Sequence, residues 1–309
     1  MTTTTTTTTT STSIKHLVIA GGGPILIQTI GILQQLENKS YFKRSSIKSI
    51  YGTSAGGVVG MLYCLNYEWN IINNYVIGRP WNYLYSINTN MILQSYVNCG
   101  IFDKNITIKA FKPLLEAKDI DINITLKEFY ELTLIELHLF TLDLYSFKTI
   151  DLSYLNFPEM KLLDAIHMTC AIPIIFAPIH YDNNKYCFID GGVLCNYPLK
   201  LCLDKYNDPE STLGINNINF DKEDESTKLK INNLFDYMLY FMKGIIIYIG
   251  IGLSSFQDEN KNKIKYEIIT NETNNFSFQF ISKVLSNIIL RTELLQKGID
   301  VVNNYDGFN

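Results

Sequence analysis

Tyr51-Gly52-Thr53-Ser54-Ala55-Gly56-Gly57 is the stretch that decides the fold, because it places a serine between glycines at the boundary of two predicted elements. A predicted strand ends at Ser49-Ile50 ahead of it, and the apolar run Val58–Leu65 behind it predicts a buried helix. A G-x-S-x-G pattern between a strand and a helix is typical of a nucleophile elbow, whose sharp turn leaves no room for side chains on either flank. We therefore expect the Ser54 hydroxyl to stand at the N-terminus of this helix, where the helix dipole favours developing negative charge. These residues alone fit an ordinary glycine-rich loop nearly as well, so other stretches have to decide.

The composition excludes several classes of protein. The 309 residues are 47% hydrophobic, enough for a large α/β core, and the net charge of −4 provides no basic field to hold nucleic acid or anionic lipid. The cysteines form no C-x-x-C pair, and with four histidines they make no zinc pattern. We therefore expect no metal, no cofactor and a reducing, cytoplasmic location. The cysteines are Cys64, Cys99, Cys170, Cys187, Cys195 and Cys202.

The N-terminal region combines a polar tail with an apolar run. Residues 2–13 are threonine and serine, and we expect residues 1–13 to be a disordered tail ahead of a single domain over residues 14–309. No charged residue appears from Leu17 to Leu36, a length that could cross a bilayer or serve as a signal sequence. Gly21-Gly22-Gly23-Pro24 would break such a helix, and no small-x-small cleavage site follows. We instead expect a strand over His16–Ala20, a tight loop and a helix over Ile25–Glu37, in a soluble chain.

The loop Gly21–Gly23 offers backbone N–H groups at the start of this predicted helix. Two functional interpretations stand beside a simple structural turn. A dinucleotide site would use Gly21-x-Gly23, but Leu26 replaces the third glycine of that fingerprint and no acidic residue ends the second strand. An oxyanion hole would aim the N–H groups of Gly22 and Gly23 at a carbonyl oxygen that becomes negative in the transition state. With a serine elbow one strand later, the oxyanion interpretation is favoured.

The stretch over residues 157–198 supplies an acidic residue. The sequence predicts a helix over Leu162–Ile166, a proline-punctuated loop over Thr169–Pro178 and a strand over Tyr186–Ile189 after a hairpin turn. Asp190-Gly191-Gly192 follows directly. An aspartate at a strand end before two glycines can bring its carboxylate close to another backbone turn, although an ordinary Asx turn has the same pattern.

These motifs, in this order, resemble the patatin-like phospholipase family. The resemblance covers roughly residues 14–220 and is specific, because several independently spaced motifs agree. The Asn- and Ile-rich composition also resembles members of the family from large DNA viruses. The resemblance implies a three-layer αβα fold with a central, mostly parallel sheet. The motifs are Gly21–Gly23, Gly52–Gly56, Asp164-Ala165, Ala171-x-Pro173-x-x-Phe176-x-Pro178, Asp190–Gly192 and Asn196-x-Pro198.

The resemblance also implies a catalytic Ser–Asp dyad without histidine, at Ser54 and Asp190. Asp190 would take the Ser54 proton, return it to the leaving alcohol and then activate the water that hydrolyses the acyl-enzyme. The implied oxyanion hole comprises Gly21, Gly22, Gly23 and Ala55. The glycines that shape the elbow and the acidic turn are Gly52, Gly56, Gly191 and Gly192. In the family the loop usually carries a basic residue and then a further glycine where this chain has Ile25 and Leu26.

The implied function is that of a phospholipase A-type lipid acyl hydrolase, peripheral on membranes and acting on phospholipids or related lipid esters. The oligomeric state stays open. Two alternatives are a catalytically inert patatin-like scaffold that binds lipid or a partner, and a flavin or NAD protein. An α/β-hydrolase triad ending in His167 or His180 is disfavoured, because that fold needs several strands before its elbow and only about 40 ordered residues precede Ser54. No histidine follows His180.

Some further elements carry no assigned chemistry. Ile135–Leu144 and Phe147–Leu152 predict paired strands, with His138 as a packed residue of the first. Thr125 and Glu128 fit a capping box at the start of a short helix.

The C-terminal third predicts mainly supporting elements. Residues 221–230 predict a charged, solvated loop. The apolar stretch Leu234–Phe256 predicts a buried helix, with an interfacial helix as the alternative. A last amphipathic helix is expected to dock on the core. Its predicted apolar face comprises Ile281, Val284, Leu285, Ile288, Ile289 and Leu295.

Overall fold

The computed structural model describes residues 13–217, 263–270 and 278–308, together with single positions between 231 and 248. Residues 1–12 of the predicted tail and the predicted charged loop over residues 221–230 lie outside this part. The predicted helix over Leu234–Phe256 also lies outside it, apart from single positions. No helix in the described part is both long enough and apolar enough to cross a bilayer.

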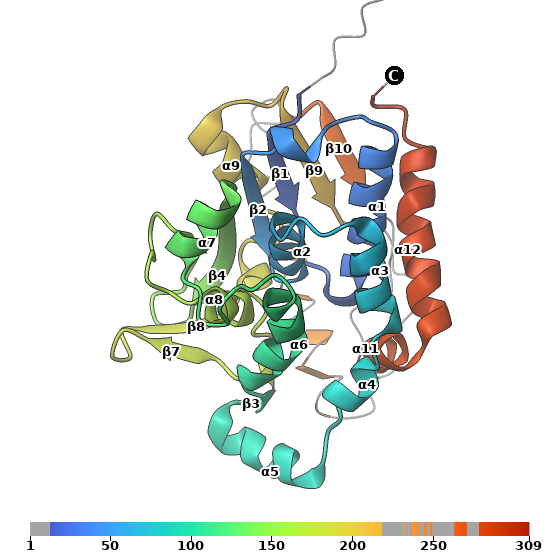
Figure 1. Ribbon diagram of the computed structural model, residues 1–309. Coiled ribbons are helices and arrows are strands. Elements are labelled where there is room, and N and C mark those ends of the chain that lie inside the picture. Colours follow the sequence, from blue (N-terminus) through green and yellow to red (C-terminus); the bar gives the residue numbers. More distant parts are fainter. Residues whose placement is uncertain are drawn as a thin grey trace, which may run out of the picture.

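The centre of the fold is a sheet that is parallel where it carries the predicted motifs (Figure 1). In the described part of the chain, eight strands follow the order β10-β9-β1-β2-β4-β8-β7, with β5 paired to β4. The pairs from β10 to β4 are parallel, whereas β4–β8, β7–β8 and β4–β5 are antiparallel. These strands are β1 His16–Ile19, β2 Ser49–Thr53, β4 Glu136–Asp143, β5 Lys148–Leu152, β7 Ile179–Tyr181, β8 Tyr186–Asp190, β9 Thr212–Asn216 and β10 Tyr266–Ile269. The predicted α/β architecture is confirmed.

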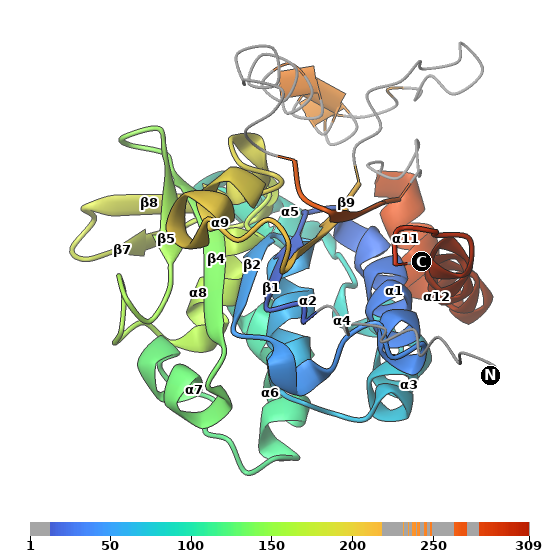
Figure 2. The ribbon, with the colours of Figure 1, turned by 90° about the horizontal axis from the view of Figure 1, so that it is seen from above.

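Helices cover both faces of the sheet. Leu17 and Ile19 belong to the large core beneath α1 and α2, whereas Val18 between them joins a smaller cluster beneath α9, because successive strand residues point to opposite faces. Figure 2 shows α9 on the other side of the strands from α1 and α2. The longer helices are α1 Leu26–Asn38, α2 Ala55–Cys64, α3 Trp69–Gly78, α5 Thr89–Asn98, α6 Asn105–Glu116, α7 Leu126–Thr133, α8 Leu162–Thr169, α9 Leu199–Tyr206, α11 Phe278–Ser286 and α12 Ile288–Asn303.

Short elements complete the connections between these layers. A separate parallel pair, β3 and β6, lies beside a small apolar cluster that includes Ile101, Phe102 and Ile175. The short elements are η1 Gly23–Ile25, η2 Arg44–Ser46, α4 Trp81–Leu84, β3 Gly100–Phe102, β6 Ile174–Phe176 and η3 Gly191–Val193.

The C-terminal region differs from the single helix that the sequence predicts. Two helices occur instead, because the Asn287 side chain accepts a hydrogen bond from the Leu290 N–H at 3.1 Å and caps a new helix there. Ile288 and Ile289 are consequently exposed, so their predicted place on the core face is wrong. The predicted docking on the core is confirmed, since α12 lies along α1, where the backbones approach closely at Gly31 and Gly298.

Two local predictions are confirmed. Thr125 and Glu128 form the capping box of α7, with the Thr125 hydroxyl accepting from the Glu128 N–H and the Glu128 carboxylate accepting from the Thr125 N–H. β4 and β5 pair antiparallel, and the His138 ring is buried within β4. Both patterns depend on residues that are close in sequence.

Candidate active site

Ser54 occupies a strained turn between β2 and α2. Its backbone angles are φ 53° and ψ −124°, a region that non-glycine residues adopt only where the surrounding structure imposes it. At Gly52 a Cβ atom would come within 2.6 Å of the Gly56 carbonyl oxygen, and at Gly56 it would collide with the carbonyl oxygens of β1 and Ala20. The geometry that the elbow motif predicts is therefore present. β2 extends to Thr53, so the strand leads directly into the serine.

Asp190 reaches Ser54 from the end of β8. The Ser54 Oγ donates a hydrogen bond to Asp190 Oδ2 at 2.7 Å, and the Gly192 N–H donates to Asp190 Oδ1 at 2.7 Å. The backbone N–H of Asp190 donates to the Ala171 carbonyl at 2.9 Å, which fixes the end of the strand against the proline-punctuated segment. Both carboxylate oxygens are thus held, and one of them faces the serine.

Burial changes the acidity of this carboxyl group. Asp190 is 5% exposed and Ser54 is 7% exposed. Burial raises the pKa of Asp190 to about 6, because desolvation disfavours the carboxylate more than the hydrogen bonds from Ser54 and Gly192 favour it. A carboxylate with a pKa near 6 can accept a proton at neutral pH, which the ordinary aspartate does less effectively.

The glycine loop lies against the elbow. A Cβ at Gly21 would lie 2.6 Å from Asn196 Oδ1 and 3.1 Å from the Ser54 Cβ, so a side chain here would force its neighbours to move. The Gly21 N–H donates to the Asn196 carbonyl at 3.0 Å, and the prediction of Gly21 as an oxyanion donor is therefore wrong for this amide. Within the described part of the chain, the N–H groups of Gly22, Gly23 and Ala55 have no acceptor. These three amides remain available to a ligand.

Gly191 and Gly192 form the turn after Asp190, and neither has room for a side chain. At Gly191 a Cβ would collide with the Phe140 carbonyl, and at Gly192 it would lie 2.9 Å from Asp190 Oδ1. Ile25 and Leu26 stand where the family usually has a basic residue and a glycine. Ile25 is buried, and Leu26 lines an apolar cavity.

Two threonines that the sequence did not single out hold the elbow in place. The Thr169 hydroxyl accepts from the Ser54 N–H at 2.9 Å and donates to the Phe140 carbonyl at 2.5 Å. The Thr53 hydroxyl donates to the Cys195 carbonyl at 2.8 Å. A threonine at a helix end or strand end carries no distinctive sequence signal, so only the fold could assign these contacts.

None of the four histidines, all of which are in the described part, is hydrogen-bonded to Ser54 or Asp190. His167 is buried, with Nδ1 paired to the Thr107 hydroxyl at 3.0 Å and Nε2 donating to the Ala177 carbonyl at 2.9 Å. His180 lies in β7 beside the Tyr145 hydroxyl. The described residues also contain no group of His, Cys, Asp and Glu side chains arranged to hold a metal ion.

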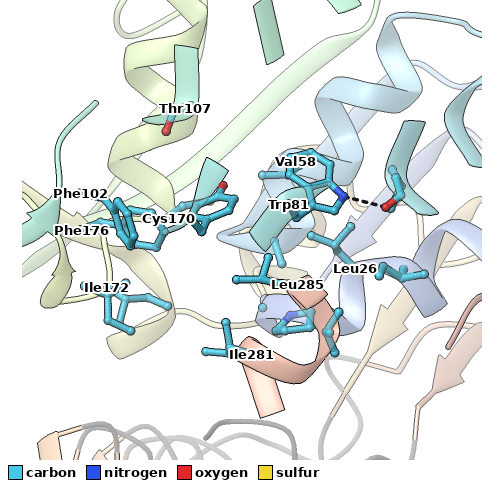
Figure 3. Close-up of a pocket in the computed structure, with 18 of the residues that line it drawn as sticks. Leu26, Val58, Trp81, Phe102, Thr107, Cys170, Ile172, Phe176, Ile281 and Leu285 are labelled. Carbon is cyan, nitrogen blue, oxygen red and sulfur yellow. Dashed lines mark hydrogen bonds between the residues drawn. The ribbon is translucent and has the colours of Figure 1, made fainter. Parts of the chain in front are cut away.

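An apolar cavity of about 490 Å³ opens beside Ser54. Figure 3 shows Phe102, Phe176 and Cys170 on one side of it and Leu26, Trp81 and Leu285 on the other. The Trp81 Nε1 donates to the Val76 carbonyl at 2.8 Å, which fixes the indole in the wall. Gly23 and Ala55 also line the cavity, so two of the free amides and the serine border the same apolar space.

Comparisons with known proteins identify the family of the chain. The family model described as patatin-like phospholipase matches residues 17–203, more than half of the chain. The "Probable lipid hydrolase 463L" of Invertebrate iridescent virus 6 is 28% identical over 195 residues, which cover 62% of this chain and 64% of that protein. This chain therefore spans less than two thirds of the length of that relative.

Further matches are more distant. The "Uncharacterized protein R571" of Acanthamoeba polyphaga mimivirus is 24% identical over 265 residues, covering 79% of this chain and 86% of that protein. Both relatives are viral, in agreement with the resemblance to viral members of the family. The crystal structure of VipD from Legionella pneumophila superposes with a TM-score of 0.45 at 15% identity, covering 92% of this chain and 67% of that chain.

Proposed function

The chain belongs to the patatin-like phospholipase family, and from this membership and the site we propose that it is a phospholipase A-type lipid acyl hydrolase that uses Ser54 and Asp190. The observation that carries the proposal is the buried hydrogen bond of 2.7 Å from Ser54 Oγ to Asp190 Oδ2. The name of the iridescent virus relative, a probable lipid hydrolase, supports the same class of substrate.

In the proposed reaction, Ser54 Oγ attacks the carbonyl carbon of a fatty-acyl ester while its proton moves to Asp190 Oδ2. Collapse of the tetrahedral intermediate breaks the bond to the alcohol oxygen, which takes the proton from Asp190 and leaves. Water then attacks the acyl-enzyme, gives a proton to Asp190, and the fatty acid leaves as Ser54 regains that proton. No histidine is needed, because the carboxylate itself is the base.

The negative oxygen of the intermediate needs donors that are already in place. The free N–H groups of Gly22, Gly23 and Ala55 support an oxyanion hole at the start of α2, where the helix dipole adds to the stabilisation. Each such donor contributes roughly 3 kcal/mol to transition-state stabilisation. The apolar cavity beside Ser54 would accept the acyl chain, since its walls offer burial to methylene groups and few polar partners.

We further propose that the protein is cytoplasmic and meets its substrate at a membrane surface. The test is incubation of the purified chain with phosphatidylcholine that carries distinct, isotopically labelled acyl chains at its two positions. We expect release of free fatty acid and lysophospholipid, measured by mass spectrometry, and no release with Ser54→Ala. Absence of any acyl release from phospholipid and neutral lipid esters alike would favour the inert scaffold instead.

A further inference from the structure

Helix α5 presents an apolar face that the rest of the described molecule does not cover. Four of its five large apolar residues, Ile92, Leu93, Tyr96 and Val97, are at spacings of one and four, which places them on one stripe of the helix. None of the ten residues of α5 is buried. The exposed fractions are 46% for Ile92, 69% for Leu93, 91% for Tyr96 and 80% for Val97.

The segment around this helix has the composition of an interface with lipid. No charged residue occurs from Pro80 to Phe102, in a chain in which 18% of residues are charged. Trp81 and Tyr83 precede α5, and Tyr83 is exposed. Tryptophan and tyrosine favour the boundary between hydrocarbon and water, and aliphatic residues favour the acyl region just below it. An uncharged face matches a neutral lipid surface and offers no ion pairs to a protein partner.

The same segment forms part of the wall of the cavity beside Ser54. Tyr85 and Ile87 ahead of α5 and Phe102 after it line the cavity. Met91 on the inner side of α5 packs against the small apolar cluster of Ile101 and Phe102, so the helix is anchored to the cavity wall. In Figure 1, α5 lies at the bottom of the molecule, the end toward which the parallel strands run, and Ser54 directly follows one of these strands, β2.

We propose that the exposed stripe of α5 docks the protein on the surface of a lipid bilayer, so that the cavity beside Ser54 opens toward the acyl esters. This inference rests on the proposed function, because it identifies where the enzyme meets its substrate. A lipid that leaves the bilayer beside α5 passes Tyr85, Ile87 and Phe102 and keeps its acyl chain in apolar surroundings.

A second copy of the chain fits this face less well. One face of a ten-residue helix measures about 15 Å by 10 Å, far below the ~800 Å² that each partner buries in a standard protein interface. A bilayer needs no matching shape, and a few inserted apolar side chains suffice for reversible binding.

The test compares vesicle binding by the full chain and its variants. Leu93→Ser and the double variant Leu93→Ser/Tyr96→Ser remove apolar surface from α5, and Leu132→Ser is the matched control. Leu132 is an exposed leucine of α7, which precedes the amino end of β4 and lies on the left of Figure 1, well above α5. With neutral phosphatidylcholine vesicles in a flotation assay, we expect roughly tenfold weaker binding for Leu93→Ser, a larger loss for the double variant and no change for Leu132→Ser.

A second measurement reports the position of the helix directly. In Tyr96→Trp, the new indole should shift to shorter emission wavelength on addition of vesicles and be quenched by lipids brominated in the upper acyl chain. Hydrolysis of a short, soluble ester should be equal in wild type and the α5 variants, because none of the residues changed lines the cavity.

The possible outcomes separate the two proposals. Vesicle binding by the folded double variant at the wild-type level, or no vesicle binding by the wild type, overturns the docking surface. A wild-type dimer that the double variant converts to a monomer, without any effect on vesicle binding, assigns the stripe to self-association and also overturns it. Loss of vesicle binding in the α5 variants together with no esterase activity in the wild type supports docking and contradicts the proposed hydrolysis.

Discussion

Ser54 Oγ and Asp190 Oδ2 lie 2.7 Å apart although 136 positions separate the two residues in the chain. Ser54 follows β2 and Asp190 ends β8, and both strands pair with β4, which runs parallel to β2 and antiparallel to β8. The long β4 therefore brings the two strand ends together.

Ser54 is expected to be the nucleophile in preference to the neighbouring thiol of Cys170. Burial raises the pKa of Cys170 above its usual range, so the thiol stays protonated and unreactive. An alkyl fluorophosphonate should label the wild type at Ser54, as mapped by peptide mass spectrometry. Ser54→Ala should lose the label and at least about 10⁴-fold of the esterase activity, whereas Cys170→Ala should keep the label. Labelling at Cys170 would contradict the assignment.

The esterase activity should rise with pH through about 6. Asp190 must be ionised to accept the serine proton, and burial raises its pKa to about 6, so kcat/KM should fall at lower pH and level off above this value. Above pH 6, Asp190→Asn should lose at least about 10³-fold, because an amide cannot take the proton. His180→Ala is the control, and an unchanged profile is expected. A profile that disappears with a histidine variant would indicate a triad.

Asp190 should reduce the stability of the folded protein at neutral and alkaline pH. Its pKa is raised from 3.8 to about 6, so the folded state binds the proton more tightly than the unfolded state. The resulting stabilisation is complete below pH 3.8 and is lost as pH rises through 6, with a total of up to about 3 kcal/mol. Asp190→Asn should therefore unfold at a higher urea concentration than wild type at pH 8, and the difference should shrink toward pH 4.5. A less stable variant at pH 8 would refute this.

Thr169 should act on catalysis through the position of Ser54. Thr169→Val keeps the shape but leaves the Ser54 N–H and the Phe140 carbonyl without the partner they share. We expect kcat to fall roughly 10- to 100-fold, because small displacements of a nucleophile cost this much, while KM changes little. Thr169→Ser should restore most of the activity. Equal kcat values for Thr169→Val and wild type would show that the turn keeps its conformation without the Thr169 hydroxyl.

His138 should stabilise the fold most at low pH. Burial disfavours the charged ring, but hydrogen bonds to Asp151, 2.8 Å from Nδ1, and to Glu136 outweigh it and raise the pKa of His138. The stabilisation is complete below pH 6.5, the ordinary value, and is lost as pH rises through the raised pKa. Urea unfolding of His138→Gln should show a deficit of about 1–3 kcal/mol at pH 6 and a smaller one at pH 9. A deficit that grows with pH would reverse this assignment.

The sequence by itself determined those features that depend on neighbouring residues. The elbow around Ser54 needs Gly52 and Gly56 within two positions of the serine, so five consecutive residues suffice to predict the strained turn. The capping box of Thr125 and Glu128 and the paired strands β4 and β5 are equally local. For Asp190, the order of the motifs identified the residue, and the fold placed its carboxylate.

Only the tertiary structure decided which polar groups are free and which are occupied. The Asn196 carbonyl accepts the hydrogen bond of the Gly21 N–H, and the Thr169 hydroxyl accepts that of the Ser54 N–H. The two residues of each pair are far apart in the chain, so sequence spacing could not predict these contacts. The exposure of Tyr96 could not be predicted from the sequence either, because an apolar residue at helical spacing gives the same pattern whether or not another element covers it. Burial and hydrogen-bond partners are properties of the packed chain, and they bring a serine and an aspartate that are 136 positions apart into one buried hydrogen bond.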